Sequence, residues 1–242
     1  MRAGETKMYS IHHLIRRTLA TACSLCGMAA NADALCEGCS NDILRIKQQG
    51  CWCVQCAVRI DPEASRCAQC QRWSPAFTHT VTAIDYAYPG ALLIRRLKVH
   101  GQLAQANLFA RMLALTMASH AGGLPPLQAI VPIPASDSAL RKRGFNPAAE
   151  IARALSGHLG LPMRSSWLRR TRESALQKSL RYSERRESVR GLYACREAIP
   201  GVWIGVVDDV LTSGATMHEA ALTLKRAGAL GVVALVASRT TW

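Results

Sequence analysis

The chain of 242 residues is poor in aromatic side chains and has no apolar run long enough to cross a bilayer. Phe, Trp and Tyr make up only 5% of it, so few rings are available for stacking on nucleic-acid bases. A membrane-spanning helix needs about 20 consecutive apolar residues. The glycine-rich GxxxxGK[ST] loop of nucleoside triphosphatases is also absent. These absences exclude a membrane span and P-loop chemistry.

The sequence also lacks a recognisable secretory signal. Its stretch Ser10–Thr21 is mildly amphipathic, but two histidines and two arginines interrupt it, whereas a signal peptide has an unbroken apolar core. We therefore predict an N-terminal helix over residues 1–21. The missing signal, together with the way cysteine is used, predicts a cytoplasmic protein.

Cysteine is abundant, and eight of the ten cysteines fall into four CxxC pairs. One CxxC turn presents two thiolates to a metal ion, and two such turns complete a tetrahedral zinc site. The spacing favours two zinc sites in series, with a crossed pairing as the open alternative. In series, the first site is Cys23, Cys26, Cys36 and Cys39, and the second is Cys53, Cys56, Cys67 and Cys70.

Other uses of these cysteines fit less well. Disulfides belong to oxidising compartments, and a redox CxxC would need a thioredoxin-like βαβ context that surrounds none of the pairs. Cys51 lies beside the second site and is a further candidate ligand, whereas Cys195 stands alone. Because four thiolates leave no position for water, we expect structural sites rather than catalytic ones.

The most specific motif is VVDDVLTSGAT at Val206–Thr216. The apolar run Val202–Val207 is typical of a buried parallel strand, and helix-forming residues follow the motif. Small hydroxyl residues and a glycine at a helix N-terminus form a phosphate site. The adjacent carboxylates of Asp208 and Asp209 can accept hydrogen bonds from sugar hydroxyls or help to hold a metal ion. The motif therefore predicts a ribose 5-phosphate site, against the plainer alternative of a capped helix with two solvated aspartates.

The motif resembles the signature with which type I phosphoribosyltransferases bind phosphoribosyl pyrophosphate (PRPP). The resemblance implies that Asp208 and Asp209 hold the ribose hydroxyls and that magnesium accompanies PRPP. It implies a cradle for the 5-phosphate made of Thr212, Ser213, Gly214, Ala215 and Thr216. Purine-type members carry an acidic residue at the position of Thr212, so this chain has no evident general base there.

Positive charge is concentrated in one segment of the chain. The net charge is +14, and the segment Arg164–Arg196 holds ten Lys or Arg residues against three Glu. Such a segment attracts polyanions such as pyrophosphate, nucleotides or nucleic acid. We interpret it as a partly helical flap that closes over an anionic ligand, with a solvated helix face as the alternative.

Elsewhere, apolar strands alternate with helices, which predicts a mainly parallel sheet with right-handed crossovers. In such sheets ligands bind at the carboxyl ends of the strands, where Asp208 lies. The expected strands are Thr80–Tyr88, Ala129–Ile133, Val202–Val207 and Gly231–Ala237. The expected helices follow Pro89 and span Gln102–Ala121, Asn146–Leu159 and the stretch after Thr216.

From Cys23 to Arg239 the order of motifs resembles the ComF family: four CxxC pairs, RRLKVHGQ, VPIP with RKRGFN, TR…Q…L…R, and VVDDVLTSGAT. The resemblance implies an α/β fold, a type I phosphoribosyltransferase-like parallel sheet flanked by helices and preceded by a small zinc-ribbon module. Residues 22–76 would be the double zinc ribbon and residues 77–242 the phosphoribosyltransferase-like domain. It also implies a role in natural competence, with single-stranded DNA and the DNA-uptake machinery as partners.

The same resemblance adds residues to the site. It implies Lys98 near the active site, Arg143 in a family-specific loop, and Arg172 with Gln177 in a flexible loop. Lys98, Arg143 and Arg172 are therefore candidates to neutralise the departing pyrophosphate, which is catalysis by positioning and electrostatics.

The chain departs from the family pattern at two positions. Pro147 stands where the family usually has Gln, and Ser188 where it usually has Asn. Both lie outside the phosphate loop, so PRPP binding is the firmer expectation. Two hypotheses stay open: an enzyme that transfers phosphoribose to an unidentified acceptor, and a PRPP-sensing or nucleic-acid-binding adaptor without the chemistry.

Overall fold

The computed structural model describes residues 20–31, 35–48, 50–120, 123–173 and 187–240. Contacts divide the chain into two compact units, Met1–Gln49 and Gly50–Trp242. The helix expected over residues 1–21 lies outside the described residues except for its last two, which belong to strand β1. In the described part of the chain, no helix is both long and apolar enough to cross a membrane.

The first unit is small and is built around four cysteines. It holds an antiparallel hairpin of β1 (Ala20–Ala22) and β2 (Ala29–Asn31), followed by helix α2 (Glu37–Gln48). Only a few apolar side chains are buried there, among them Leu35 and Ile43. A core this small supplies little stability, as the cysteine content predicts.

The second unit is built on a four-stranded sheet in which every pairing is parallel. The strand order is β5 (His79–Asp85), β10 (Gly231–Arg239), β9 (Trp203–Leu211) and β6 (Ala129–Pro132). The central strand β10 is buried along its whole length, as expected for a strand covered on both faces.

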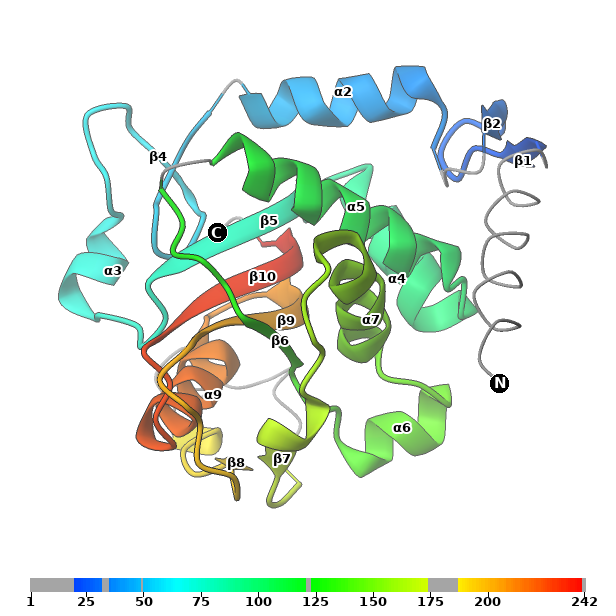
Figure 1. The fold of residues 1–242 in the computed structure, drawn as a ribbon. Coiled ribbons are helices and arrows are strands. Elements are labelled where there is room, and N and C mark those ends of the chain that lie inside the picture. The colour runs from blue at the N-terminus through cyan, green and yellow to red at the C-terminus, as the bar shows by residue number, and fades with distance from the viewer. Residues whose placement is uncertain (1–19, 32–34, 49, 121–122, 174–186, 241–242) are drawn as a thin grey trace, which may run out of the picture. The chain divides into compact units, whose positions relative to one another are not determined.

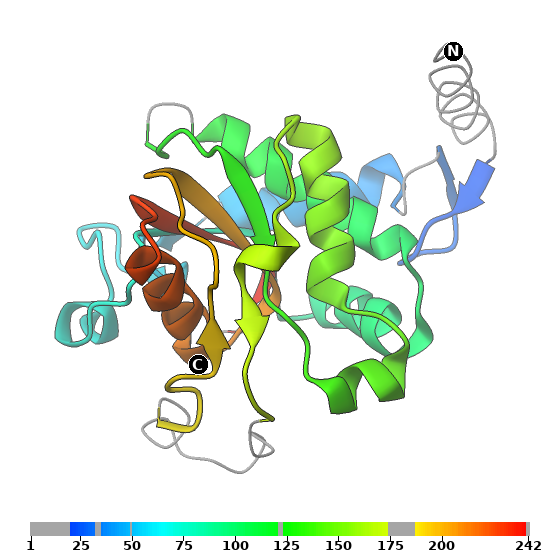
Figure 2. The same ribbon diagram turned by 60° about the horizontal axis from the view of Figure 1, so that its bottom comes forward.

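Helices cover both faces of this sheet (Figures 1 and 2). Helices α5 (Ala104–Ser119) and α7 (Pro147–Leu159) pack on one face, with α4 (Gly90–His100) beside α5, and α9 (Ala215–Arg226) packs on the other. Small and aliphatic side chains on one side of each helix supply the buried contacts. The predicted parallel sheet flanked by helices is confirmed.

The stretch before Asn146 differs from the expectation. The family resemblance implies a loop at Arg143, but Arg143 is the last residue of the short helix α6 (Asp137–Arg143), which begins after Ser136 and ends at Gly144. The next helix begins at Asn146, whose side chain accepts a hydrogen bond from the Ala148 N–H at 3.1 Å. Pro147 occupies the first turn of that helix, where the missing N–H and fixed φ of proline are favourable.

Strand β9 is longer than the apolar run predicts. It continues to Leu211, because Asp208 and Leu211 keep the register with Val236 and Arg239 of β10. The two aspartates therefore lie in the paired part of β9 instead of in the loop that follows the strand. They are held at the carboxyl edge of the sheet by backbone pairing.

The remaining elements are short. A second cysteine-bearing hairpin, β3 and β4, precedes helix α3, and a two-residue ladder joins β7 to β8. Their bounds are β3 (Cys51–Trp52), β4 (Arg59–Ile60), α3 (Ala68–Arg72), the 3₁₀-helix η1 (Ser165–Trp167), β7 (Arg169–Arg170) and β8 (Tyr193–Ala194).

Candidate functional site

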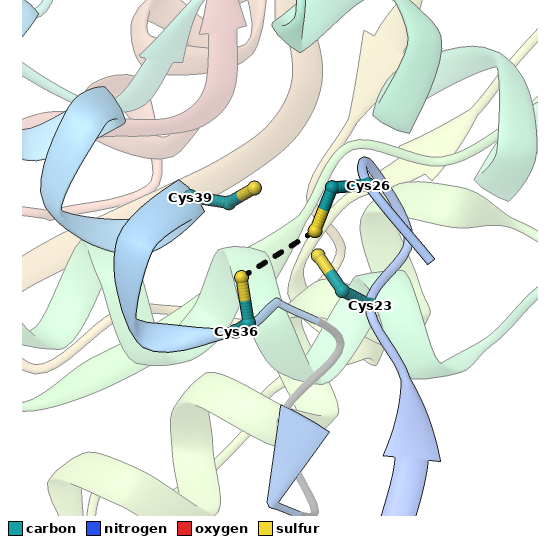
Figure 3. A group of neighbouring side chains, drawn as sticks. All are labelled: Cys23, Cys26, Cys36 and Cys39. Atoms are coloured by element: carbon teal, nitrogen blue, oxygen red, sulfur yellow. Dashed lines mark hydrogen bonds between the residues drawn. The ribbon is translucent and has the colours of Figure 1, made fainter. Parts of the chain in front are cut away.

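The first group of cysteines comes from the β1–β2 turn and the start of α2. The four thiols of Cys23, Cys26, Cys36 and Cys39 point toward one centre (Figure 3), and all four sulfurs lie within 4.8 Å of one another. The Cys26 and Cys36 sulfurs are 3.6 Å apart. Four sulfurs this close together could serve as the ligands of one metal ion.

The second group belongs to the unit that holds the sheet. Cys53, Cys56, Cys67 and Cys70 also lie within 4.8 Å of one another, and three of the four are buried. Cys51 is exposed and lies outside both groups. The structure therefore has the serial arrangement of the two predicted alternatives, with one group in each compact unit.

The proton affinities of these thiols fit a metal site. Hydrogen bonds from the Cys56 and Cys70 side chains lower the pKa of Cys53, while the Cys53 thiolate raises the pKa of Cys70 and raises that of Cys56 to about 12. Four thiolates this close would repel one another, so without a cation the charge lies on Cys53, and the neighbouring Cys56 and Cys70 thiols hydrogen-bond to it. A divalent cation that prefers sulfur ligands removes this repulsion, and each group could hold one such ion.

At the carboxyl edge of the sheet, a lysine is paired with the acidic residues of β9. The Lys98 ammonium, in the last turn of α4, lies 2.9 Å from an Asp209 carboxylate oxygen. The side chains are 25% and 14% exposed, so the pair is largely shielded from solvent. The fold thus brings Lys98 to the acidic motif across more than a hundred residues of sequence.

The second carboxyl of the motif is held in an unusual electrostatic state. Burial and the neighbouring Asp209 charge raise the pKa of Asp208 to about 7, against the lowering effects of the Asp209 N–H and of Lys98. That N–H donates to Asp208 Oδ1 at 2.8 Å. Near neutral pH the pair is therefore ready to accept a cation or hydroxyl donors, either of which would favour its fully ionised form.

The loop after β9 turns directly into α9. Gly214 adopts a left-handed conformation with φ of 77°, and α9 begins at the next residue. The Ser213 hydroxyl accepts a 3.4 Å hydrogen bond from the Ala215 N–H, and Thr212 is exposed. The N–H groups of the first turn of α9, among them that of Ala215, therefore lie within a few residues of three hydroxyl side chains, those of Thr212, Ser213 and Thr216.

In the described part of the chain, the two arginines predicted for the site, Arg143 and Arg172, do not contact the acidic pair. Arg143 is the exposed last residue of α6. Arg172 donates from Nη2 to the carbonyl oxygens of Arg190 at 2.9 Å and Ser188 at 3.4 Å. Among the described residues, neither arginine forms an ion pair or hydrogen bond with Asp208 or Asp209. Gln177 and most of the expected flap lie outside the described residues.

A groove of about 650 Å³, which the sequence does not predict, lies along α9. One wall is a stripe of α9 that starts next to the phosphate loop, and the other is the segment after residue 186. The Glu219 carboxylate, which is 6% exposed, accepts the Gly191 N–H at 2.7 Å and joins the walls. The spacing of Ala215, His218, Leu222 and Arg226 marks one helical face, but the sequence gives no sign of the opposite wall.

His218, in the first part of α9, is engaged in packing. Its Nδ1 accepts a 3.0 Å hydrogen bond from the Ala76 N–H, and its ring lies 4.9 Å from that of Trp73. These contacts fix the ring against the segment that follows the second cysteine group.

Comparison with known proteins gives relatives along most of the chain. No family model matches. The DNA utilization protein YhgH of Escherichia coli K12 is 30% identical over 227 residues, which are 92% of this chain and 99% of that protein. Competence protein F of Haemophilus influenzae is 27% identical over 203 residues, 81% of this chain and 86% of that protein.

Solved structures give weaker matches. Adenine phosphoribosyltransferase from Leishmania tarentolae is 17% identical, with 59% of this chain and 60% of that chain covered and a TM-score of 0.37. The enzyme of the same name from Leishmania donovani is 12% identical, with 69% and 85% covered and a TM-score of 0.39. The chain spans 24% of the Leishmania donovani UMP synthase, with 60% of this chain covered, 22% identity and a TM-score of 0.36.

At TM-scores below 0.5 these structures add nothing to the assignment, which rests on the sequence relatives. The identity to the Escherichia coli protein extends over nearly its whole length. Both cysteine groups and the VVDDVLTSGAT motif lie in this chain in the expected order. The chain therefore belongs to the ComF family, together with competence protein F and the DNA utilization protein YhgH.

Proposed function

We propose that this protein binds PRPP with magnesium at the carboxyl edge of its sheet. The observation that carries the proposal is the Lys98–Asp209 ion pair. Its Asp209 lies on β9, the strand that leads into the left-handed turn at Gly214 and the N-terminus of α9. A sugar phosphate needs anion-binding N–H groups and acceptors for its hydroxyls within one small site. Both are present within the nine residues from Asp208 to Thr216.

The chemistry of the ligand matches these groups in order along the chain. The 5-phosphate would take the N–H groups and hydroxyls of residues 212–216, and the ribose hydroxyls would donate to Asp208 and Asp209. Magnesium supplies charge neutralisation for the pyrophosphate. Lys98, on release from Asp209, can contribute a second positive charge to the same leaving group, which is electrostatic catalysis without a covalent step.

Calorimetric titration tests the proposal. Mg²⁺-PRPP is titrated into the metal-replete wild type and into the Asp208→Asn/Asp209→Asn variant. The expected result is saturable binding by the wild type and at least a hundredfold weaker binding by the variant, a loss of about 2.7 kcal/mol. Asp61→Asn, which removes an exposed carboxylate in the same unit, is the matched control. A folded wild type that does not bind Mg²⁺-PRPP would rule the proposal out.

A second candidate function is ligand binding without transfer. It is favoured by Thr212, which stands where purine-type enzymes carry an acid, and by His218, whose ring is held by Ala76 and Trp73. Binding of PRPP without its consumption in the presence of nucleobases or single-stranded DNA would support it. Steeply salt-dependent binding of single-stranded DNA would then point to the nucleic-acid adaptor.

The names of the relatives bear on the cellular role. Because they are called a DNA utilization protein and a competence protein, we propose a role in the uptake or use of single-stranded DNA in the cytoplasm. We also propose that each cysteine group holds one structural zinc ion, since four thiolates at tetrahedral spacing suit zinc. Elemental analysis of purified protein should then give two zinc ions per chain, and a content below one would contradict this assignment.

A further inference from the structure

One charged side chain lies almost completely inside the second unit. Arg239, the last residue of β10, is 3% exposed. Its guanidinium donates to the carbonyl oxygens of Leu211 at 3.0 Å and Thr212 at 2.7 Å. These two residues are the end of β9 and the first position of the phosphate loop. Burying a guanidinium is costly unless its donors are satisfied, so these contacts fix the path of the chain at that point.

The same guanidinium reaches the second cysteine group. Its Nε donates to the carbonyl oxygen of Cys56 at 2.9 Å. The two residues before Cys56 are held by the sheet in the same way: Thr80 donates from its N–H to the Val54 carbonyl at 3.1 Å and from its hydroxyl to the Gln55 carbonyl at 2.6 Å. Three consecutive carbonyl groups of one CxxC turn are therefore bound to the ends of β5 and β10.

The phosphate loop is also supported from its other side by the segment that follows the second cysteine group. A Cβ added at Gly214 would lie 3.6 Å from the Phe77 ring and 3.9 Å from the Trp73 ring. The Gln55 amide, from the same CxxC turn, donates to the carbonyl oxygens of Pro75 at 3.1 Å and Phe77 at 3.0 Å. The loop therefore lies between two supports, and both are bonded to the Cys53–Cys56 turn.

We propose that Arg239 is a positioning residue that couples the second cysteine group to the phosphate loop, so that metal in this group controls the affinity of the loop for its ligand. The inference rests on the proposed PRPP site, because the loop is the part that the coupling holds in shape. Metal bound by Cys53, Cys56, Cys67 and Cys70 fixes the turn, the turn fixes Arg239 and residues 73–77, and these fix residues 211–214. A rigid loop binds phosphate more tightly because its ordering cost has been met before binding.

The test combines two measurements on the full-length, metal-replete chain. Hydrogen–deuterium exchange of residues 211–216 reports the loop without any ligand, and titration with Mg²⁺-PRPP reports its affinity. Both are applied to wild type, Arg239→Met and Arg239→Lys. Arg226→Met is the matched control, since Arg226 is an exposed arginine at the far end of α9. Elemental analysis confirms that every variant keeps the wild-type metal content.

We expect Arg239→Met to speed exchange in residues 211–216 and to weaken Mg²⁺-PRPP binding about tenfold or more, within the usual range of coupling between sites. Arg239→Lys should recover part of both effects, because a lysine can serve some of the same carbonyls. Arg226→Met should change neither. Wild-type exchange and wild-type affinity in a folded Arg239→Met protein would overturn the proposal.

A second arm addresses the metal directly and protects the test against a poorly folded arginine variant. Cys67→Ser removes one ligand of the second group, whereas Cys51→Ser removes an exposed cysteine outside it. Faster exchange of residues 211–216 in Cys67→Ser but not in Cys51→Ser supports the coupling. Unchanged exchange in a Cys67→Ser protein that has lost its metal overturns it. If the wild type does not bind Mg²⁺-PRPP, the proposed function fails, and the exchange data still decide the coupling.

Discussion

At the scale of single residues, the folded protein disfavours the ionised form of Asp208. Its pKa is raised to about 7 by burial and by Asp209, from 3.8 for an ordinary carboxyl. Between these pH values the folded protein keeps a proton that the unfolded chain has lost, so stability falls as the pH rises. The deficit is complete above about pH 7 and amounts to about 4 kcal/mol at most. Lower stability of the ligand-free protein is a common cost of a functional site.

Asp208→Asn should therefore stabilise the protein while impairing ligand binding. The amide cannot ionise, and its oxygen can still accept the Asp209 N–H. Thermal unfolding should show a higher midpoint than wild type at pH 8.5, with the difference shrinking toward pH 6. Comparison at equal pH cancels the pH dependence of metal binding. A variant less stable than wild type at pH 8.5 would show that Asp208 is not under this strain.

Lys98 is expected to stabilise the acidic pair before any ligand binds. Lys98→Met removes the cation 2.9 Å from Asp209 and leaves two adjacent carboxylates in a partly buried place, at a cost of about 1–2 kcal/mol at pH 8. The double variant Lys98→Met/Asp209→Asn should regain most of that loss. Denaturant unfolding of both single variants and the double variant measures the coupling, and strictly additive changes would refute the interaction.

At the scale of elements, α9 joins the phosphate loop to the wall of the groove. Glu219, in the middle of this helix, accepts the Gly191 N–H at 2.7 Å. Glu219→Ala should leave that N–H without its partner, cost about 1–3 kcal/mol, and speed proteolysis within residues 187–193. Arg226→Ala, at the exposed end of the same helix, should leave the cleavage rate unchanged. Equal cleavage of wild type and Glu219→Ala would disprove the anchoring role.

Which elements can be predicted depends on how local their cause is. Periodic apolar residues give all four strands of the parallel sheet and the four helices α4, α5, α7 and α9 that pack around it within a few residues. The extension of β9 to Leu211 has a non-local cause, since pairing with β10 carries two charged residues into the ladder. Helix α6 escaped prediction because its residues are exposed or half-buried and show no apolar period. Its signals are only the caps at Ser136 and Gly144.

At the scale of the whole molecule, each compact unit contains one cysteine group. Cys23→Ser should release one metal ion per chain and open residues 20–48 to protease, because structural zinc supplies about 10–16 kcal/mol of folding free energy in small metal-held modules. Elemental analysis and limited proteolysis check this, with Cys51→Ser as the variant that should keep both metals. Full metal content and wild-type protease resistance in Cys23→Ser would contradict the assignment.

The candidate site shows a similar division between local and distant causes. Spacing alone predicts the four CxxC pairs and favours the serial grouping that the structure has, while it leaves the crossed grouping open. The VVDDVLTSGAT motif is likewise a local pattern that favours a sugar-phosphate site over a capped helix. The partners of that motif come from distant segments, and only the family resemblance points to Lys98. Nothing in the sequence marks Arg239, because one arginine at the end of an apolar strand has no pattern. Its meaning depends on the carbonyl groups of Cys56, Leu211 and Thr212.

The central claim is that Asp208–Thr216 bind a sugar phosphate, and hydrogen–deuterium exchange with and without saturating Mg²⁺-PRPP tests it most directly. Bound PRPP should slow exchange in residues 208–216 and at the end of α4 near Lys98, with no such change in Asp208→Asn/Asp209→Asn. Unchanged exchange in these segments, or protection confined to other parts of the chain, would contradict it.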